Sequence, residues 1–429
     1  MTTALPIDWE KGEIMNASAI RFLVASALLL LFVPAWPAET IKLAFLGGLS
    51  GPYALQDEEM LKNVKTAADI VNTRGGVAGG RRFEVVALDH KANPQEALIV
   101  LKQAIDQDIR FVISGRSNIA HAITDALSKH NVRDPDRSVL FLNITGLDPV
   151  LTESKCSFWH FRFAVHADTL VSALADYMAG RPSVKTVYLL NQDYAYGQAV
   201  ARAAREMLPR RRPDVRIVGD DLVPLGKIKD FAPYVAKIRA SGADSVMTGN
   251  WGSDLTLLVK ASAEAGLNAA YYTLAAATPG NMAASGASGV DRVRTLASWS
   301  INVADPAWEK TLLGYKARYQ AMSNLDSLLP FRATEMLATA IAAAGSVDPV
   351  KVAFALEGAR YAGPSGDSWM RAEDHQIIAP IYVLSFVRAG QQGVKHDEEG
   401  SGYGWKMEAL IPAKDAVPPL NCQMERPPK

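Results

Sequence analysis

Cysteine is almost absent from this sequence, with Cys156 and Cys422 the only two among 429 residues. An excess of charge is absent too, since 45 Lys and Arg balance 45 Asp and Glu. A chain without net positive charge lacks the electrostatic field that attracts nucleic acid. We therefore expect no nucleic-acid partner.

Sequence signatures of catalysis are also missing. The chain has no G-x-x-x-x-G-K-[ST] phosphate loop, no G-x-G-x-x-G after Gly47 and no G-x-S-x-G nucleophile turn. Its seven histidines are dispersed and lack metal-ligand spacing with a carboxylate. We expect no enzymatic activity, no metal and no cofactor. A hydrolase stays open only if folding brings a nucleophile and a base into contact.

The apolar run FLVASALLLLFVPA (22–35) is too short to cross a membrane, which takes about 20 residues. An apolar core of this length, followed by small residues at Ala35 and Ala38, is typical of an export signal. We predict that residues 1–38 are a signal peptide cleaved after Ala35 or Ala38. Translation is expected to start at Met15, because the preceding segment is acidic. The mature protein is then periplasmic.

Export bears on the two cysteines. In an oxidising compartment a lone pair of cysteines favours a disulfide. We therefore predict a bond between Cys156 and Cys422. The alternative is a pair of unrelated buried thiols.

The segment Lys185–Ala204 combines a buried strand with a polar and aromatic loop. Its apolar run is of the kind that forms a parallel strand. Asp193, Tyr194 and Tyr196 follow, with Gly197 allowing close approach of the backbone. Such a loop is better suited to holding a small polar molecule than to reacting with it.

From Ile41 onward the chain alternates short apolar strands with helical segments. Four strands, each followed by a helix, lie between Ile41 and Asn143, and four more lie between Thr186 and Leu274. Repeated βα units form a parallel sheet with helices on both faces. The sequence therefore predicts an α/β protein with two doubly wound parallel-sheet lobes.

The later segments return to these two lobes, and APIYVLSFV (379–387) is a strong strand among them. The predicted boundaries are residues 39–163 plus 300–375 for lobe I and residues 164–299 plus 376–392 for lobe II. Residues 393–429 are rich in Gly, Pro and charge, which predicts an irregular tail. A cleft between two such lobes suits a ligand and hinge closure.

Small polar and aromatic residues recur where the predicted strands end, which is where open α/β sheets bind ligands. The first series offers hydroxyls and, after Arg116, the free N–H groups of a helix start, which favour an anion. The second series offers aromatic walls. The candidate ligand-binding residues are Tyr53, Gln56, Ser117, Asn118, Thr145, Gly146, Asp193, Tyr196, Asn250 and Trp251. This set suits a small carboxylate with an apolar body.

The residues from about Glu39 to Val387 resemble the type I periplasmic binding proteins of ABC importers, in the leucine/isoleucine/valine-binding branch. The resemblance rests on five segments in the family order: SGPYA (50–54), NTRGGVAGGRRFEVVALDHKANPQEA (72–97), LDPVLT (147–152), NQDYAYGQ (191–198) and KDFAPYVAKIRASGADSV (229–246). It implies two lobes joined by a three-strand hinge, with the ligand in the cleft. It also implies an inner-membrane ABC permease as partner.

In that family, hydroxyls and N–H groups after the third and fourth strands bind the α-carboxylate of the ligand. The resemblance implies this role for Ser117, Asn118, Thr145 and Gly146. The aromatic positions of the family match Tyr196 and either Trp251 or Gly252.

Two positions depart from the family pattern. The aromatic residue of the first loop falls at Gln56, and the acidic residue that pairs with the α-amine falls near Ala275. A buried ammonium would then need Asp193 or Asp254, because an unpaired buried charge costs several kcal/mol. Two ligand classes stay open: a branched-chain or hydrophobic amino acid, and an aromatic or aliphatic carboxylate without an amine.

The function that the resemblance implies is a periplasmic solute receptor, which delivers its ligand to an ABC permease without chemical turnover. The alternative is a periplasmic ligand sensor that signals through a partner protein. We expect the protein to be a monomer.

Overall fold

A computed structural model gives the fold of residues 40–51, 53–303, 305–320, 328–364 and 366–428. The predicted signal peptide, its two cleavage sites and the start at Met15 lie outside these described residues.

Lobe I is built on one five-stranded parallel sheet in the order β2-β1-β3-β4-β5. Its strands are β1 (Ile41–Gly47), β2 (Phe83–Asp89), β3 (Phe111–Ser114), β4 (Leu140–Asn143) and β5 (His160–Arg162). The central strands β3 and β4 are buried along their whole length. They read as continuous apolar runs because helices cover both faces of the sheet.

Alternate side chains of β1 point to these two faces. Leu43 and Phe45 pack with α2 (Ala54–Thr73), whereas Ala44 and Leu46 pack with the helices of the other face. The helices of that other face are α3 (Pro94–Asp106) and α4 (Ser117–Arg133). The period of two along the strand thus places one apolar layer on each side of the sheet.

Lobe II is built on a seven-stranded sheet in the order β15-β14-β10-β9-β8-β6-β7. Its strands are β6 (Thr186–Gln192), β7 (Arg216–Val223), β8 (Ser245–Thr248), β9 (Ala270–Thr273), β10 (Val293–Ala297), β14 (Ile381–Arg388) and β15 (Tyr403–Ile411). The strands from β7 to β10 are parallel, and β14 and β15 add antiparallel pairs at one edge. Its helices are α5 (Ala167–Ala179), α6 (Ala195–Arg211), α7 (Ala232–Ala240), α8 (Gly252–Glu264) and α9 (Asn281–Ser285).

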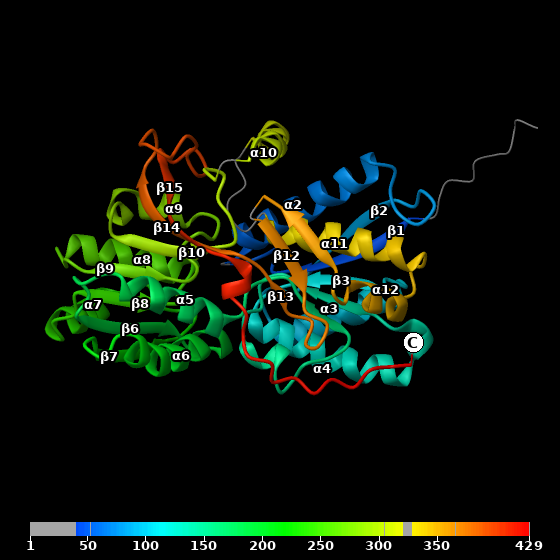
Figure 1. Cartoon of the computed structure of the whole chain (residues 1–429), viewed down its shortest axis with the longest axis horizontal. Coiled ribbons are helices and arrows are strands. Elements are labelled where there is room, and N and C mark those ends of the chain that lie inside the picture. The colour runs from blue at the N-terminus through cyan, green and yellow to red at the C-terminus, as the bar shows by residue number, and fades with distance from the viewer. Residues whose placement is uncertain (1–39, 52, 304, 321–327, 365, 429) are drawn as a thin grey trace, which may run out of the picture. The chain divides into compact units, whose positions relative to one another are not determined.

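The remaining elements lie between β10 and β14 in the chain. They are α10 (Pro306–Tyr319), α11 (Leu328–Ala344), α12 (Pro349–Leu356) and a small antiparallel sheet of β11 (Arg360–Gly363), β12 (Gly366–Met370) and β13 (Ile377–Ile378). Helix α11 packs beside α2 of lobe I (Figure 1). In the described part of the chain no single helix is long and apolar enough to span a membrane; α11 and α12 meet that test only as a pair bent by 111°.

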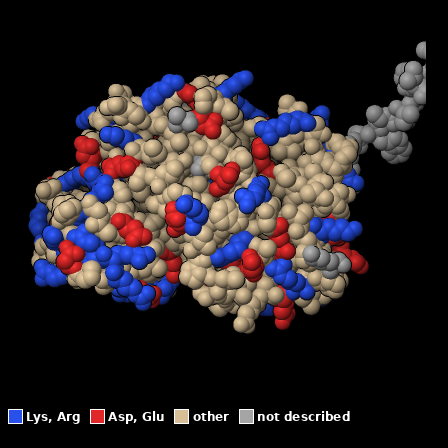
Figure 2. All heavy atoms as spheres, in the orientation of Figure 1, with Lys and Arg blue, Asp and Glu red and all other residues tan. Residues whose placement is uncertain are grey.

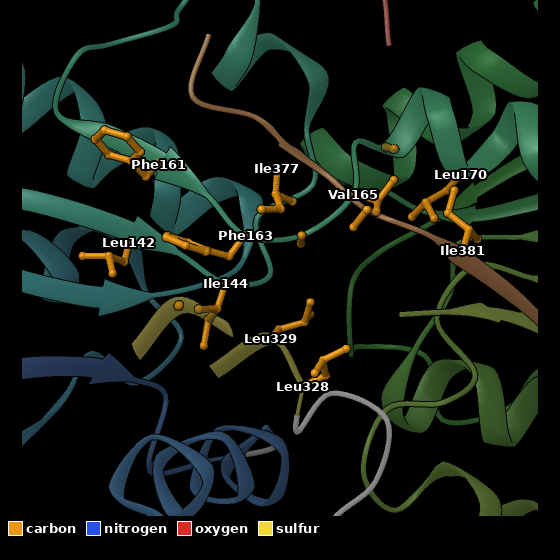
Figure 3. Close-up of a cluster of buried hydrophobic side chains, with 14 of the residues drawn as sticks. Leu142, Ile144, Phe161, Phe163, Val165, Leu170, Leu328, Leu329, Ile377 and Ile381 are labelled. Atoms are coloured by element: carbon orange, nitrogen blue, oxygen red, sulfur yellow. The ribbon is translucent and has the colours of Figure 1, made fainter. Parts of the chain in front are cut away.

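A buried apolar cluster surrounds the places where the chain passes between the lobes (Figure 3). Phe163 and Val165 lie between β5 and α5, and Leu329 lies in the first turn of α11. Ile377 and Ile381 flank the passage from β13 to β14. The two lobes therefore share one apolar core at the three crossings, as a three-strand hinge requires. The residue boundaries given above for the two lobes stay predictions.

The prediction of an irregular tail over residues 393–429 is wrong in its middle. Tyr403–Ile411 form β15, which pairs with β14 at the edge of the lobe II sheet. Trp405 supplies the burial that holds this strand, since its side chain is 1% exposed and packs against Phe386. Pairing with β14 thus makes this segment a strand, although its content of glycine and charge favours irregular structure.

Beyond β15 the tail returns to lobe I. Arg371 donates a hydrogen bond to the carbonyl of Pro418 at 2.7 Å. Cys422 forms a disulfide with Cys156, so the predicted bond is confirmed. The tail is therefore a fourth connection between the lobes, in addition to the three crossings.

Lys and Arg are interspersed with Asp and Glu over the face shown in Figure 2. In the described chain, opposite charges are also paired across neighbouring elements, among them Arg205 with Asp220 and Lys237 with Asp221. Both signs of charge are thus spread over this face, in agreement with the zero net charge.

Candidate functional site

The loops at the carboxyl ends of both sheets meet around one cavity. From lobe I come the loops after β3 and β4, together with the first turn of α2. From lobe II come the loops after β6, β8 and β9. Parallel strands bring all their carboxyl ends to one edge of a sheet, which explains why these distant segments gather there.

The cavity has a volume of about 130 Å³ and a largely apolar lining. The aliphatic side chains that line it include Leu147, Val165, Leu170, Leu274, Leu329 and Ile381. Several of them also belong to the apolar core at the lobe crossings. The floor of the cavity is thus the hinge region itself.

Arg116 is the one charged side chain among the described residues that line the cavity. It lies at the N-terminal end of α4, with a φ of 63° that non-glycine residues rarely adopt. Its guanidinium pairs with Asp57, with Nη2 2.7 Å from Oδ1 and Nε 3.3 Å from Oδ2. Asp57 in turn accepts the backbone N–H of Gly48 at 2.5 Å. A strained backbone held by a buried ion pair is typical of a functional position.

The guanidinium of Arg116 also packs against two neighbouring aromatic rings. Its central carbon is 4.6 Å from the ring centre of Tyr53 and 4.8 Å from that of Trp251. Contacts of a cation with ring faces at these distances are attractive. The side chain keeps one edge toward Asp57, and its Nη1 is not hydrogen bonded to any described residue. That nitrogen can donate to an anionic ligand.

Three aromatic side chains of lobe II form a wall of the cavity. Trp251 donates from Nε1 to the hydroxyl of Tyr194 at 2.9 Å, and Tyr194 packs against Tyr196. Burial raises the pKa of the Tyr194 hydroxyl above its ordinary value, so this group stays neutral. The wall offers flat apolar surface to a ligand.

The structure brings four of the ten candidate residues to the cavity lining: Gln56, Thr145, Tyr196 and Trp251. Tyr53 packs on Trp251 with ring centres 4.8 Å apart, outside the lining. As ligand contacts these residues stay predictions.

The other candidates do not line this cavity, and most have structural partners. The hydroxyl of Ser117 accepts the N–H groups of Leu147 and Asp148, and Gly146 is held by Asn143. The remaining three are Asn118, Asp193 and Asn250. Ser117 and Gly146 therefore shape the loop after β4.

The acidic residues considered as amine partners also lie off the lining. Asp193 is exposed and accepts a hydrogen bond from Gln198 at 2.8 Å. Asp254 accepts from Gln192 and from the N–H of Gly226, each at 2.8 Å. Ala275 does line the cavity, and none of the described lining residues is Asp or Glu. A ligand ammonium would find no carboxylate among the described residues of this lining.

Sequence reasoning gave Arg116 no role of its own. Its position directly before a helix start was visible, but its partner Asp57 lies 59 residues away and in another element. The aliphatic floor was also missed, because hydrophobic side chains at a hinge are indistinguishable in sequence from ordinary core. Within the described residues no group of three or more His, Cys, Asp or Glu is placed to hold a metal ion.

The comparisons with known proteins agree with this architecture. A family model described as periplasmic binding protein matches residues 40–392. Leu/Ile/Val-binding protein homolog 4 of Brucella melitensis is 30% identical over 399 residues, which cover 91% of this chain and 94% of that protein.

Solved structures show the same fold. The leucine-, isoleucine-, valine-, threonine-, and alanine-binding protein from Brucella ovis, in its closed conformation, has a TM-score of 0.82 and 28% identity, over 91% of this chain and 100% of that one. A solute-binding protein of an ABC transporter from Rhodopseudomonas palustris, in complex with 3,4-dihydroxybenzoic acid, has a TM-score of 0.75 and 18% identity, over 87% and 98%. The chain therefore belongs to the type I periplasmic binding protein family of ABC-transporter solute-binding proteins.

Proposed function

We propose that this protein is the receptor for a small carboxylate with an apolar body and no α-amine. The observation that carries the proposal is the composition of the cavity: one arginine, an aromatic wall and an aliphatic floor, without Asp or Glu among its described lining residues. Of the two ligand classes that the sequence leaves open, this composition favours the acid without an amine.

Charge balance is the physical reason for that preference. An ammonium buried without a carboxylate costs several kcal/mol, since neither solvent nor an opposite charge compensates it. A carboxylate can accept from Nη1 of Arg116 and from the hydroxyl of Thr145, which also lines the cavity. Hydrogen bonds between ionised groups are stronger than those between neutral groups. The lining thus offers hydrogen-bond donors to a carboxylate, while the charge of Arg116 itself is balanced by Asp57.

The relatives include binding proteins for each of the two ligand classes. The protein from Brucella ovis is a leucine-, isoleucine-, valine-, threonine-, and alanine-binding protein, and the protein from Rhodopseudomonas palustris is in complex with 3,4-dihydroxybenzoic acid, which has no amine. The aromatic wall of Tyr194, Tyr196 and Trp251 matches the flat face of such an acid. Family membership supports delivery of the ligand from the periplasm to an inner-membrane ABC permease without chemical turnover. The monomeric state stays a prediction.

Thermal denaturation with candidate ligands tests the ligand class. Benzoate or an aliphatic monocarboxylate at about 100 times its dissociation constant should stabilise the folded protein by roughly 2.7 kcal/mol. Leucine at the same concentration should give little or no shift, because its ammonium lacks a partner. Mass spectrometry of ligand released from the purified, denatured protein provides an independent measurement. Stabilisation by leucine alone would contradict the proposal.

A further inference from the structure

We propose that Tyr53 and Gly226 form the contact that sets how tightly the two lobes close and, through closure, how slowly ligand is released. The inference rests on the proposed function, because it assigns the control of ligand release at the same cleft. Neither residue lines the cavity, so both act through lobe position rather than by touching the ligand.

The contact joins the two lobes at one point of close approach. Tyr53 lies in lobe I, directly before the first turn of α2, and Gly226 lies in lobe II, between β7 and α7. A Cβ atom added to Gly226 would lie 2.3 Å from the hydroxyl oxygen of Tyr53 and 3.1 Å from its Cζ. Real Cβ atoms do not approach other atoms to 2.3 Å. Any larger residue at position 226 must therefore displace Tyr53 or part the lobes.

Tyr53 has little freedom to move aside. Its side chain is 7% exposed, and its ring packs on Trp251 and beneath the guanidinium of Arg116. Burial also raises the pKa of its hydroxyl to about 12. A rotation of the ring would break contacts with both neighbours.

Gly226 is fixed from the other side. Its φ of 68° belongs to the left-handed region that favours glycine, and its N–H donates to Oδ2 of Asp254. Because Asp254 also accepts from Gln192 at the end of β6, the loop is tied to the lobe II sheet. The loop therefore cannot withdraw without breaking a partly buried hydrogen bond.

Two neighbouring contacts also join α2 to lobe II, but the side chain in one of them can move aside easily. Gln56 donates to the carbonyl of Pro279 at 3.1 Å, and a Cβ atom on Gly280 would lie 2.7 Å from Cδ2 of Leu55. The side chain of Leu55 is half exposed, and its tip can swing away. The rigid partner, and thus the decisive one, is Tyr53.

The substitution Gly226→Ala should hold the lobes apart by wedging against Tyr53. The expected result is a dissociation rate for benzoate at least about tenfold faster in stopped flow, with little change in the association rate, because changes within one interface act mainly on dissociation. Small-angle X-ray scattering of the ligand-free protein should show a larger radius of gyration. The matched control is Gly266→Ala, also in lobe II, whose φ of 65° imposes the same backbone strain but whose Cβ would meet nothing within 4 Å.

A double-mutant cycle separates wedging from general damage. Tyr53→Phe removes the hydroxyl that the new methyl group would strike, so Tyr53→Phe combined with Gly226→Ala should recover most of the slow dissociation. Equal behaviour of Gly226→Ala and Gly266→Ala in both measurements would overturn the proposal, as would failure of the double variant to recover.

The experiment also distinguishes this inference from the proposed function. If the wild-type protein binds neither benzoate nor leucine, the proposed function fails, and the scattering comparison of the ligand-free variants still decides the closure contact. If the wild type binds benzoate but Gly226→Ala releases it at the wild-type rate, the proposed function stands and the closure contact is wrong.

Discussion

Arg116 combines a positive φ, a buried partner in Asp57 and a place in the cavity lining. Arg116→Lys keeps the positive charge but loses the planar fork, so it cannot hold Asp57 and a ligand carboxylate at once. We expect it to weaken benzoate binding by at least about tenfold, or 1.4 kcal/mol, in isothermal titration calorimetry. Arg318→Lys is a suitable control, because that arginine pairs with Asp69 on the surface.

The substitution Asp193→Asn tests whether the ligand carries an amine. Asp193 is exposed and outside the cavity lining, so its neutralisation should change the affinity for benzoate by less than about twofold. A tenfold loss of affinity for leucine in this variant would instead favour an amino-acid ligand held by Asp193.

Asp254 gives a prediction for the dependence of stability on pH. Burial raises the pKa of its carboxyl above the ordinary 3.8, so the folded state binds this proton more tightly than the unfolded state does. Its stabilising contribution is therefore complete below pH 3.8 and is lost as pH rises through the folded-state pKa. At neutral pH the buried charge is a cost.

Asp254→Asn removes that charge while one amide oxygen can still accept from Gln192 and Gly226, since both bonds go to the same carboxylate oxygen. We expect a higher free energy of unfolding than wild type at neutral pH, with the gain shrinking toward acid pH in urea titrations. The exposed Asp193→Asn serves as control. A gain that is independent of pH would show that another cause operates.

At the level of single residues, the sequence located the cavity better than it assigned roles within it. Gln56, Thr145, Tyr196 and Trp251 follow predicted strands and do line the cavity. Ser117 follows a strand too, but its hydroxyl braces the next loop. Whether a polar group faces a ligand or a neighbouring backbone depends on tertiary packing, which the spacing of residues along one chain does not contain.

Among the secondary-structure elements, the buried parallel strands were predictable and the edge strand was not. A strand covered on both faces, such as β4, leaves a continuous apolar run in the sequence. β15 is an edge strand with several exposed residues, next to glycines at 400 and 402 and to Pro412. β15 forms because it pairs with β14, and this pairing cannot be inferred from the sequence of β15 alone.

The stability of β15 should depend on one side chain. Trp405 is 1% exposed and packs on Phe386 of β14, so Trp405→Ala should lower the free energy of unfolding by roughly 3–5 kcal/mol. Met407 is 48% exposed on the same strand, and Met407→Ala should stay within about 0.5 kcal/mol of wild type. Guanidinium denaturation measures both. Equal losses would mean that β15 is not held by its buried face.

For the molecule as a whole, the disulfide between Cys156 and Cys422 closes a loop with a sequence separation of 266. A cross-link of this span contributes on the order of 5 kcal/mol in the chain-entropy model, and engineered bonds often give less. Replacing both cysteines with serine should lower the midpoint of thermal denaturation. Thiol titration of the denatured, unreduced wild-type protein should find no free thiol, and two free thiols would contradict the bond.

The same disulfide decides which parts of the molecule carry a mechanical load. Strand β1 begins lobe I near one end of the described chain, and Cys422 lies near the other end, bonded to Cys156 in lobe I. Tension applied between Ile41 and the C-terminus passes through lobe I and across the sulfur atoms. Every residue of the lobe II sheet lies between the two cysteines, in the part of the chain that the disulfide bypasses. An unfolding motor that pulls on either end would therefore unfold lobe I first, because lobe II bears no force while the disulfide is intact.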